Sequence, residues 1–180
     1  MKVISGFLKG RNIKGYDIDG TRPTMDRVKE SLFAMIQDKV PDSIVLDLFA
    51  GSGALGIEAI SNGSKKCYFN DHNKKCVMGI KALLKEFKVD NYEITPYDYN
   101  KALSYYKENN ITFDIIFLDP PYKFRDINNI CSYIYENNLL NKDGLIVIEI
   151  NELYLDIDYL NKIKEKKYND KYILIYKNNL

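Results

Sequence analysis

The chain has 180 residues and a net charge of +1, so its bulk charge does not indicate a nucleic-acid partner, and its length is most simply that of one domain. Its three cysteines form no C-x-x-C pair and it has a single histidine, so we expect no metal site, no disulfide framework and reduced thiols in a cytoplasmic protein. We also expect no secretory signal and no membrane helix, because the chain lacks a long apolar span.

Positive charge is concentrated in the first 29 residues. Seven Lys and Arg stand there against three Asp, a local excess of +4 (7 − 3). The basic residues are Lys2, Lys9, Arg11, Lys14, Arg22, Arg27 and Lys29. Such an arm can steer a near-neutral protein toward phosphate, although an ordinary solvated face would have the same composition.

The N-terminal region is predicted to contain two strands and a helix. The strands are expected at 3–8 and 13–16, around the turn Gly10-Arg11-Asn12. Thr24 is positioned to be the N-cap of the following helix, in which apolar residues recur at helical spacing through residue 36.

From residue 44 the pattern alternates between strands and helices. Strands are expected at 44–48, 66–70, 92–95, 113–118 and 144–150, and helices at 54–62, 73–87, 99–108 and 126–136. In the tail, a short helix near 155–163 should precede two β-runs at 165–169 and 171–177, split by the turn signal Asn169-Asp170. We therefore predict an α/β fold with a mostly parallel, seven-stranded Rossmann-like sheet, helices on both faces and a C-terminal antiparallel hairpin.

A glycine-rich turn follows the first of these strands. Gly51-Ser52-Gly53-Ala54-Leu55-Gly56 matches G-x-G-x-x-G, which by itself fits a nicotinamide dinucleotide site. Asp47 lies inside the preceding strand, where its charge would repel a pyrophosphate but tolerate the cationic end of S-adenosylmethionine. Phe49-Ala50 also adds two residues before the first glycine. We therefore favour a methyl-donor site over a dinucleotide site or a purely structural turn. Its candidate residues are Asp47, Phe49, Ala50, Gly51, Ser52 and Gly53.

Two further acids follow the next two strands. Asp71 is a suitable acceptor for two ribose hydroxyls, because adjacent hydroxyls both donate; alternatively it caps the helix beginning at Asn73. Asp98 could accept a hydrogen bond from an adenine amino group, or it could cap its own helix. Ligands of open α/β sheets bind beyond the carboxyl ends of the strands, where these acids are expected to converge.

The apolar run 113–118 ends in Asp119-Pro120-Pro121-Tyr122. Proline fixes φ and removes an amide donor, so this corner is rigid and presents carbonyl acceptors. An exocyclic purine amine becomes nucleophilic when acceptors hold its two hydrogens, and Asp119 and the Pro120 carbonyl are placed to do so. Tyr122 could stack on the base. The alternative is an ordinary tight turn.

Three segments together resemble the RsmD family, bacterial methyltransferases for the guanine N2 position of 16S ribosomal RNA. The segments are Arg22–Glu30, Leu46–Ala59 and the corner Asp119–Tyr122. The last two are shared by many methyltransferases, and the first carries the specificity. The resemblance covers essentially the whole chain and implies the class I fold with S-adenosylmethionine as cofactor.

The resemblance also implies a division of the chain into an RNA-binding extension, residues 1–40, and a catalytic core, residues 41–180. Arg22, Thr24 and Arg27 would line the edge of the cleft, Thr24 as a cofactor contact and the arginines toward RNA; the arginines could instead pair with Asp26 or Glu30. The basic residues Lys9, Arg11 and Lys14 would meet the RNA backbone.

The residue that matches the family's ribose-binding acid remains open at this point. The family often has Glu where this chain has Asp71, and a shift of one residue would place Asn70 there instead. The substrate implied is 16S ribosomal RNA within the small subunit or its precursor. From its size as a small single-domain enzyme, we expect the protein to work as a monomer.

Three competing functions differ in testable ways. An adenine N6 methyltransferase of DNA or RNA also uses an x-Pro-Pro-Tyr corner, commonly with Asn where this chain has Asp119, and a sequence-specific DNA enzyme would need a separate recognition domain. A dehydrogenase would bind nicotinamide. A non-catalytic ribosome-assembly factor should have lost the glycine motif or Asp119, and both are intact.

Overall fold

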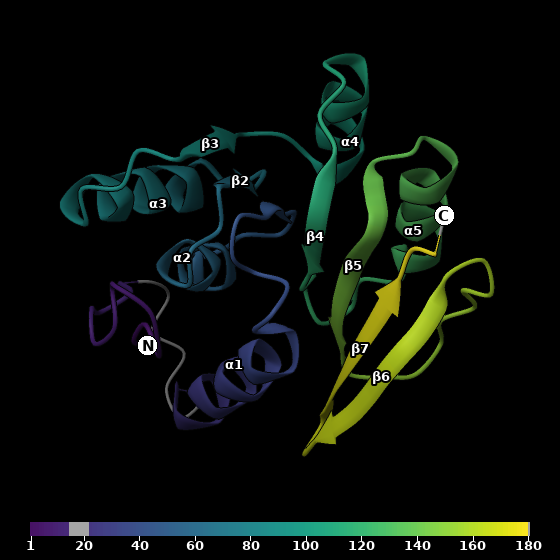
Figure 1. Cartoon of the computed structure of the whole chain (residues 1–180), viewed down its shortest axis with the longest axis horizontal. Helices are drawn as coiled ribbons and strands as arrows, with labels where there is room; N and C mark the ends of the chain where they lie inside the picture. The colour runs from purple at the N-terminus through teal and green to yellow at the C-terminus, as the bar shows by residue number, and fades with distance from the viewer. Residues whose placement is uncertain (15–21, 180) are drawn as a thin grey trace.

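A computed structural model describes residues 1–14 and 22–179, without the side chains of residues 22–24. Within this part, one seven-stranded sheet runs in the order β3-β2-β1-β4-β5-β7-β6 (Figure 1). The strands are β1 (Ile44–Asp47), β2 (Lys66–Asn70), β3 (Tyr92–Thr95), β4 (Phe113–Leu118), β5 (Leu140–Ile150), β6 (Asn161–Tyr168) and β7 (Lys171–Lys177). The helices are α1 (Arg22–Ile36), α2 (Ala54–Ser61), α3 (Lys74–Glu86), α4 (Tyr99–Glu108) and α5 (Ile127–Glu136). The first five strands are parallel and β7 is antiparallel to both neighbours, which confirms the predicted fold class.

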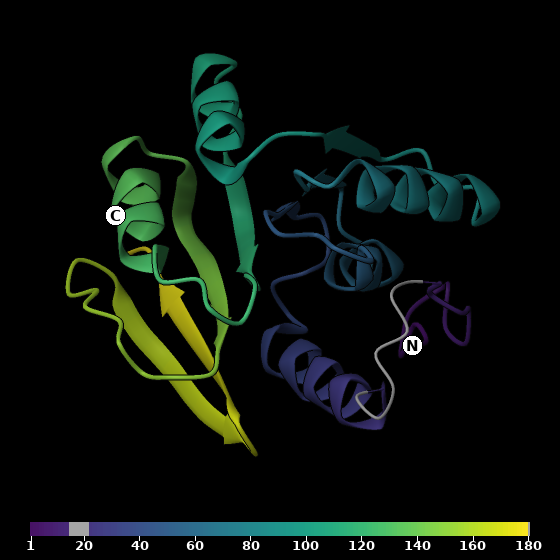
Figure 2. The ribbon, with the colours of Figure 1, turned by 180° about the vertical axis from the view of Figure 1, so that it is seen from behind.

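The sheet separates two apolar cores. Successive side chains of a strand point to opposite faces, so Phe117 of β4 packs with α1, α2 and α3, whereas Ile116 packs with α4 and α5. The two groups of helices accordingly lie on opposite sides of the sheet (Figures 1 and 2). Burial on both faces explains why the central strand reads as an almost continuous apolar run. None of the described helices has the length and apolar character needed to cross a membrane.

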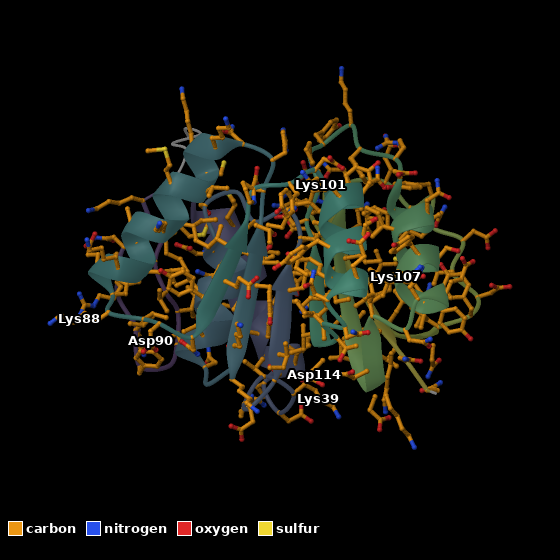
Figure 3. All side chains as sticks on the ribbon, turned by 90° about the horizontal axis from the view of Figure 1, so that it is seen from above. Lys39, Lys88, Asp90, Lys101, Lys107 and Asp114 are labelled. Carbon is orange, nitrogen blue, oxygen red and sulfur yellow. The ribbon has the colours of Figure 1, made fainter. Side chains whose placement is uncertain are left out.

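An acid at the amino ends of the strands has a structural partner. Asp114, near the start of β4, accepts the Ile44 N–H at 2.8 Å and the Asn141 side-chain amide at 3.0 Å (Figure 3). It therefore links the starts of three neighbouring strands. The acids at the carboxyl ends are arranged differently, as described below.

Several predicted elements differ from the structure. The prediction of two N-terminal strands was wrong in extent, because residues 1–14 form turns with a single antiparallel bridge between Lys2 and Asn12. Residues 15 and 16 of the second predicted strand lie outside the described part. Helix α1 begins at Arg22, so Thr24 is not its N-cap, and the side chain of Thr24 lies outside the described part. Strand β5 begins at 140 rather than 144, and a bulge against β4 accommodates the added residues.

The predicted tail helix is also wrong. The segment before β6 is irregular, and β6 already begins at Asn161. The side chain of Asn128, on α5, accepts the Asp156 N–H at 2.9 Å and donates to the Tyr154 carbonyl at 3.5 Å. Ile157 is buried in the core beneath. These contacts to a distant helix stabilise the segment in place of local helical hydrogen bonds.

A buried ion pair attaches the N-terminal segment to the core. Glu58, on α2, is fully buried and accepts the backbone N–H groups of Ile4 and Ser5 at 2.9–3.1 Å. Lys29, on α1, lies 3.0 Å from Glu58 and donates to the Lys2 carbonyl at 2.7 Å. Three segments therefore share one satisfied pair of charges.

Candidate active site

The turn between β1 and α2 requires its glycines. Gly51 and Gly53 have φ angles of 55° and 80°, in the left-handed region that side chains disfavour. A Cβ on Gly56 would lie 2.3 Å from the Phe69 ring, so α2 can rest on β2 only without it. Within the turn, the Gly51 N–H donates to Asp71 at 2.8 Å and the Gly53 N–H donates to the Ala50 carbonyl at 2.7 Å, so protein acceptors hold the backbone of the turn in place.

Asp47 is almost completely buried beneath this turn, with 1% of its surface exposed. One carboxylate oxygen accepts the Gly56 N–H at 3.0 Å, and the other has no hydrogen-bond partner in the described part of the chain. Burial raises the pKa of Asp47 from 3.8 to about 7; the Gly56 hydrogen bond opposes this shift and the negative charge of Asp71 adds to it. A buried oxygen of this kind suits a cationic ligand group.

Asp71 joins the glycine turn to the start of α3. Its carboxylate accepts the Gly51 N–H at 2.8 Å and the Asn73 N–H at 2.9 Å. The N-cap of α3 is Asn73, whose side chain accepts the Lys75 N–H at 2.9 Å. The alternative interpretation of Asp71 as the cap is therefore wrong.

Asn70 is occupied by hydrogen bonds inside the sheet. Its amide nitrogen donates to the carbonyls of Leu48 and Tyr97 at 3.1 and 3.0 Å, and its oxygen accepts the Thr95 hydroxyl at 2.8 Å. Asn70 is 1% exposed. The sequence left open whether Asp71 or Asn70 contacts the ribose. Asp71 has a carboxylate in the lining of a cavity, whereas the Asn70 side chain is already hydrogen-bonded within the protein.

Asp98 is the N-cap of α4, because it accepts the Lys101 N–H at 3.1 Å. The structure thus confirms the capping alternative, although Asp98 also borders the same cavity. The Lys101 ammonium, labelled in Figure 3, lies 4.5 Å from the centre of the Tyr97 ring, and Tyr97 lines this cavity.

A cavity of about 260 Å³ lies above β1 and β2 and is walled by aromatic rings; we call it the aromatic cavity. The ring centre of Phe124 lies 5.1 Å from both Phe49 and Tyr99. Tyr97 and Pro121 complete its apolar walls. A cavity lined by aromatic rings and by the two acids Asp71 and Asp98 suits a nucleoside. The sequence predicted Phe49 but missed Tyr97, Tyr99 and Phe124, because the many tyrosines of the chain hide any aromatic pattern.

A second cavity, of about 370 Å³, lies on the other side of the corner and contains the Asp119 side chain; we call it the Asp119 cavity. Its polar lining includes Glu149 of β5 and Lys171 of β7, whose charged groups lie 2.6 Å apart. Burial raises the pKa of Asp119 well above its ordinary value, and the charge of Glu149 adds to the rise, whereas Lys171 opposes it.

Sequence reasoning missed Glu149 and Lys171. A signal for Glu149 exists, since an acid interrupts the apolar run of β5 near its carboxyl end, as Asp119 follows that of β4. Lys171 gives no such signal, because its place beside Glu149 depends on the antiparallel pairing of β7.

The corner Asp119–Tyr122 borders both cavities. Asp119 lines one and Pro121 the other. A turn follows in which the Phe124 N–H donates to the Pro121 carbonyl at 2.9 Å. Pro120 is half-buried, whereas the Tyr122 ring is 67% exposed, so its stacking on a base stays a prediction.

Four of the five basic residues predicted to contact RNA lie on the surface, whereas Lys29, which was counted in the same basic segment, is buried against Glu58. Lys9, Arg11, Lys14 and Arg27 are exposed, and the side chain of Arg22 lies outside the described part. Lys14 is 3.3 Å from Glu86 and lines a hollow of about 310 Å³ with Ser52 of the glycine turn. The N-terminal arm therefore reaches the glycine turn, although these positions do not test a role in RNA binding.

The sheet order, the glycine turn after the first strand and the acidic corner after β4 define a class I methyltransferase fold. A structure of an Escherichia coli protein provisionally described as the methyltransferase yhhF matches with a TM-score of 0.87 and 26% identity over 99% of this chain and 98% of that one. The structure of SMU.776, provisionally described as a methyltransferase and complexed with SAH, has a TM-score of 0.73 and the match covers 95% of this chain and 52% of that one, but at 18% identity this shows the fold alone.

The chain belongs to the family described as "Conserved hypothetical protein 95", whose model matches residues 1–177. A Bacillus subtilis protein provisionally named as the rRNA methyltransferase YlbH is 42% identical over 150 residues, which is 83% of this chain and 82% of that one. The "Ribosomal RNA small subunit methyltransferase D" of Haemophilus influenzae is 36% identical over 151 residues, 83% of this chain and 78% of that one. These matches confirm the resemblance to the RsmD family.

Proposed function

We propose that this protein transfers a methyl group from S-adenosylmethionine to the exocyclic N2 amine of a guanine in the 16S ribosomal RNA of the small subunit. The observation that carries the proposal is the corner Asp119–Tyr122, which borders both cavities: Pro121 lines the aromatic cavity, and the acceptor carboxylate of Asp119 lines the Asp119 cavity. The names of the relatives, which specify small-subunit ribosomal RNA, support the substrate.

The described residues fit the cofactor. The aromatic cavity would hold the adenine, Asp71 would accept the ribose hydroxyls, and Asp98 would lie at the adenine edge. The buried Asp47 oxygen without a partner would face the cationic amino-acid end. When bound, S-adenosylmethionine supplies a methyl group on a good sulfonium leaving group.

Asp119 would prepare the amine. Its carboxylate and the Pro120 carbonyl would accept the two amine hydrogens, which favours a pyramidal nitrogen with an available lone pair. As the nitrogen bonds to the methyl carbon, the carbon–sulfur bond breaks and one N–H proton must leave. Burial raises the pKa of Asp119, so its carboxylate holds a proton more strongly than an exposed one.

The N-terminal 40 residues would act as the RNA-binding extension of the catalytic core, residues 41–180. Lys9, Arg11 and Lys14 are exposed on this segment, as phosphate contacts must be. Arg27 is exposed on α1. Tyr122 would stack on the base, and Arg22 and Thr24 remain predicted contacts.

Asp119→Ala tests the role of the corner. We expect the affinity for S-adenosylhomocysteine, measured by calorimetry, to stay within about threefold, because the aromatic cavity does not include Asp119. Methyl transfer should fall by roughly 10²–10⁴-fold or more, the usual contribution of a positioned acid or base. Asp158→Ala, which removes an exposed carboxylate, is the control. Normal turnover in the Asp119 variant would overturn the assignment.

A further inference from the structure

Three of the five charged residues that line the Asp119 cavity stand in a fixed order; the other two are Lys29 and Asp170. Asp119 directly follows β4, Glu149 lies in β5 and Lys171 begins β7, and these three strands are consecutive in the sheet (Figure 1). Leu118 pairs with Ile148, and the Glu149 carboxylate lies 2.6 Å from the Lys171 ammonium. Across the sheet, the order of groups is therefore carboxylate, carboxylate, ammonium.

This order is complementary to one edge of guanine. The Watson–Crick edge of guanine presents the N2 amine and N1–H as donors, followed by the O6 acceptor. A carboxylate is an acceptor only, and an ammonium is a donor only. Adenine instead presents the N6 amine beside N1, which is an acceptor, so a carboxylate facing N1 would repel it.

The surroundings of the three groups favour recognition of a base. Glu149 and Lys171 are shielded, with 15% and 31% of their side chains exposed. Lys171 donates a hydrogen bond to Oε1 of Glu149, whereas Oε2 has no hydrogen bond in the described part of the chain. The flanking walls are apolar and include Val28 and Leu32, and the volume of about 370 Å³ is in the range of small-molecule pockets, roughly 300–1,000 Å³.

We propose that Glu149 and Lys171 select guanine as the target base, Glu149 by accepting N1–H and Lys171 by donating to O6, while Asp119 accepts from the N2 amine. The inference rests on the proposed function and adds the residues that determine its specificity. It also explains the two neighbouring carboxylates, whose mutual repulsion is relieved when guanine donors lie between them. Glu149 lines the cavity, and its Oε2 has no hydrogen bond in the described part of the chain, so this oxygen can accept a donor from a bound base.

The test compares two bases that both carry the N2 amine. Small subunits are reconstituted from ligated 16S ribosomal RNA with guanine or 2,6-diaminopurine at the mapped target. Diaminopurine replaces N1–H by an acceptor and O6 by an amine, so it mismatches Glu149 and Lys171 only. We expect the wild type to prefer guanine by at least ~100-fold in kcat/KM, because shielded polar groups left unpaired by the ligand discriminate strongly.

The variants Glu149→Gln and Lys171→Met should narrow this preference to within about tenfold. Glutamine can donate to the N1 acceptor of diaminopurine, and methionine removes the repulsion of its 6-amine. Glu165→Gln, in the exposed Lys162–Glu165 pair of β6, should keep the wild-type ratio. Binding of S-adenosylhomocysteine confirms that each variant is folded.

An unchanged ratio in both cavity variants, or equal losses on both bases, would overturn the inference and leave a structural ion pair. Failure of the proposed function has a different signature. In that case the wild type would not methylate guanine N2 in the unmodified subunit at all, whatever the variants do.

Discussion

The variant Asp47→Asn should gain stability relative to the wild type as the pH rises. The carboxylate is buried, and its pKa in the folded chain is raised from 3.8 to about 7. The unfolded chain therefore releases this proton first, so the free energy of unfolding falls as the pH rises from about 4 to about 7. Asn carries no charge and escapes this loss, while its oxygen can still accept the Gly56 N–H.

The expected size follows from the shift. Each pKa unit is worth about 1.36 kcal/mol, so the shift from 3.8 to about 7 corresponds to about 4 kcal/mol in full. Between pH 5 and pH 8, the stability of Asp47→Asn relative to wild type should rise by about 3 kcal/mol. For a chain of this length, that difference corresponds to roughly 6–12 °C in Tm.

Urea unfolding of both proteins at pH 5 and pH 8 measures this difference directly. Any penalty from the new amide is the same at both pH values and cancels in the comparison. Asp47→Ala, which also loses the Gly56 hydrogen bond, serves as a second variant and should show the same pH-dependent gain on a lower baseline. Parallel pH profiles for wild type and Asp47→Asn would refute the reasoning.

Three further changes test other parts of the structure. Removing the charges of Lys9, Arg11 and Lys14 together should weaken RNA binding and reduce the slope of log K against log[salt] by about 2–3; an unchanged slope would show that the arm does not touch phosphate. Glu58→Ala should lower the free energy of unfolding by about 3–5 kcal/mol in urea titrations, because it leaves a buried lysine unpaired, and a loss below 1 kcal/mol would contradict this. Phe124→Ala should weaken S-adenosylhomocysteine binding about 10–100-fold by calorimetry through lost stacking, whereas unchanged affinity would mean that adenine does not occupy the aromatic cavity.

Much of the fold and half of the site were predictable because their signals are local. Apart from Asp114, the run 113–118 is apolar on both faces, and Asp119 follows it directly, so the strand and the acid at its carboxyl end were predicted together. The glycine turn is equally local, since Gly51, Gly53 and Gly56 each meet a requirement within their own turn or at the strand beneath it.

The features that were missed depend on contacts between distant residues. Glu149 meets Lys171 only because β7 pairs antiparallel with β5, which no local pattern reveals. The tail near 155–163 has helical spacing, but hydrogen bonds from Asn128 on α5 stabilise an irregular segment instead. From the sequence, Asp98 could be either the N-cap of its helix or a contact to the adenine, and the structure shows that it is the N-cap.

The measurement that tests the central claim most directly is methyl transfer from labelled S-adenosylmethionine to small ribosomal subunits from a strain that lacks the modification, followed by nucleoside analysis of the RNA. We predict label in N2-methylguanosine, which would establish the donor, the substrate and the target atom together. Label in N6-methyladenosine, or no label although the cofactor binds, would contradict the proposed function.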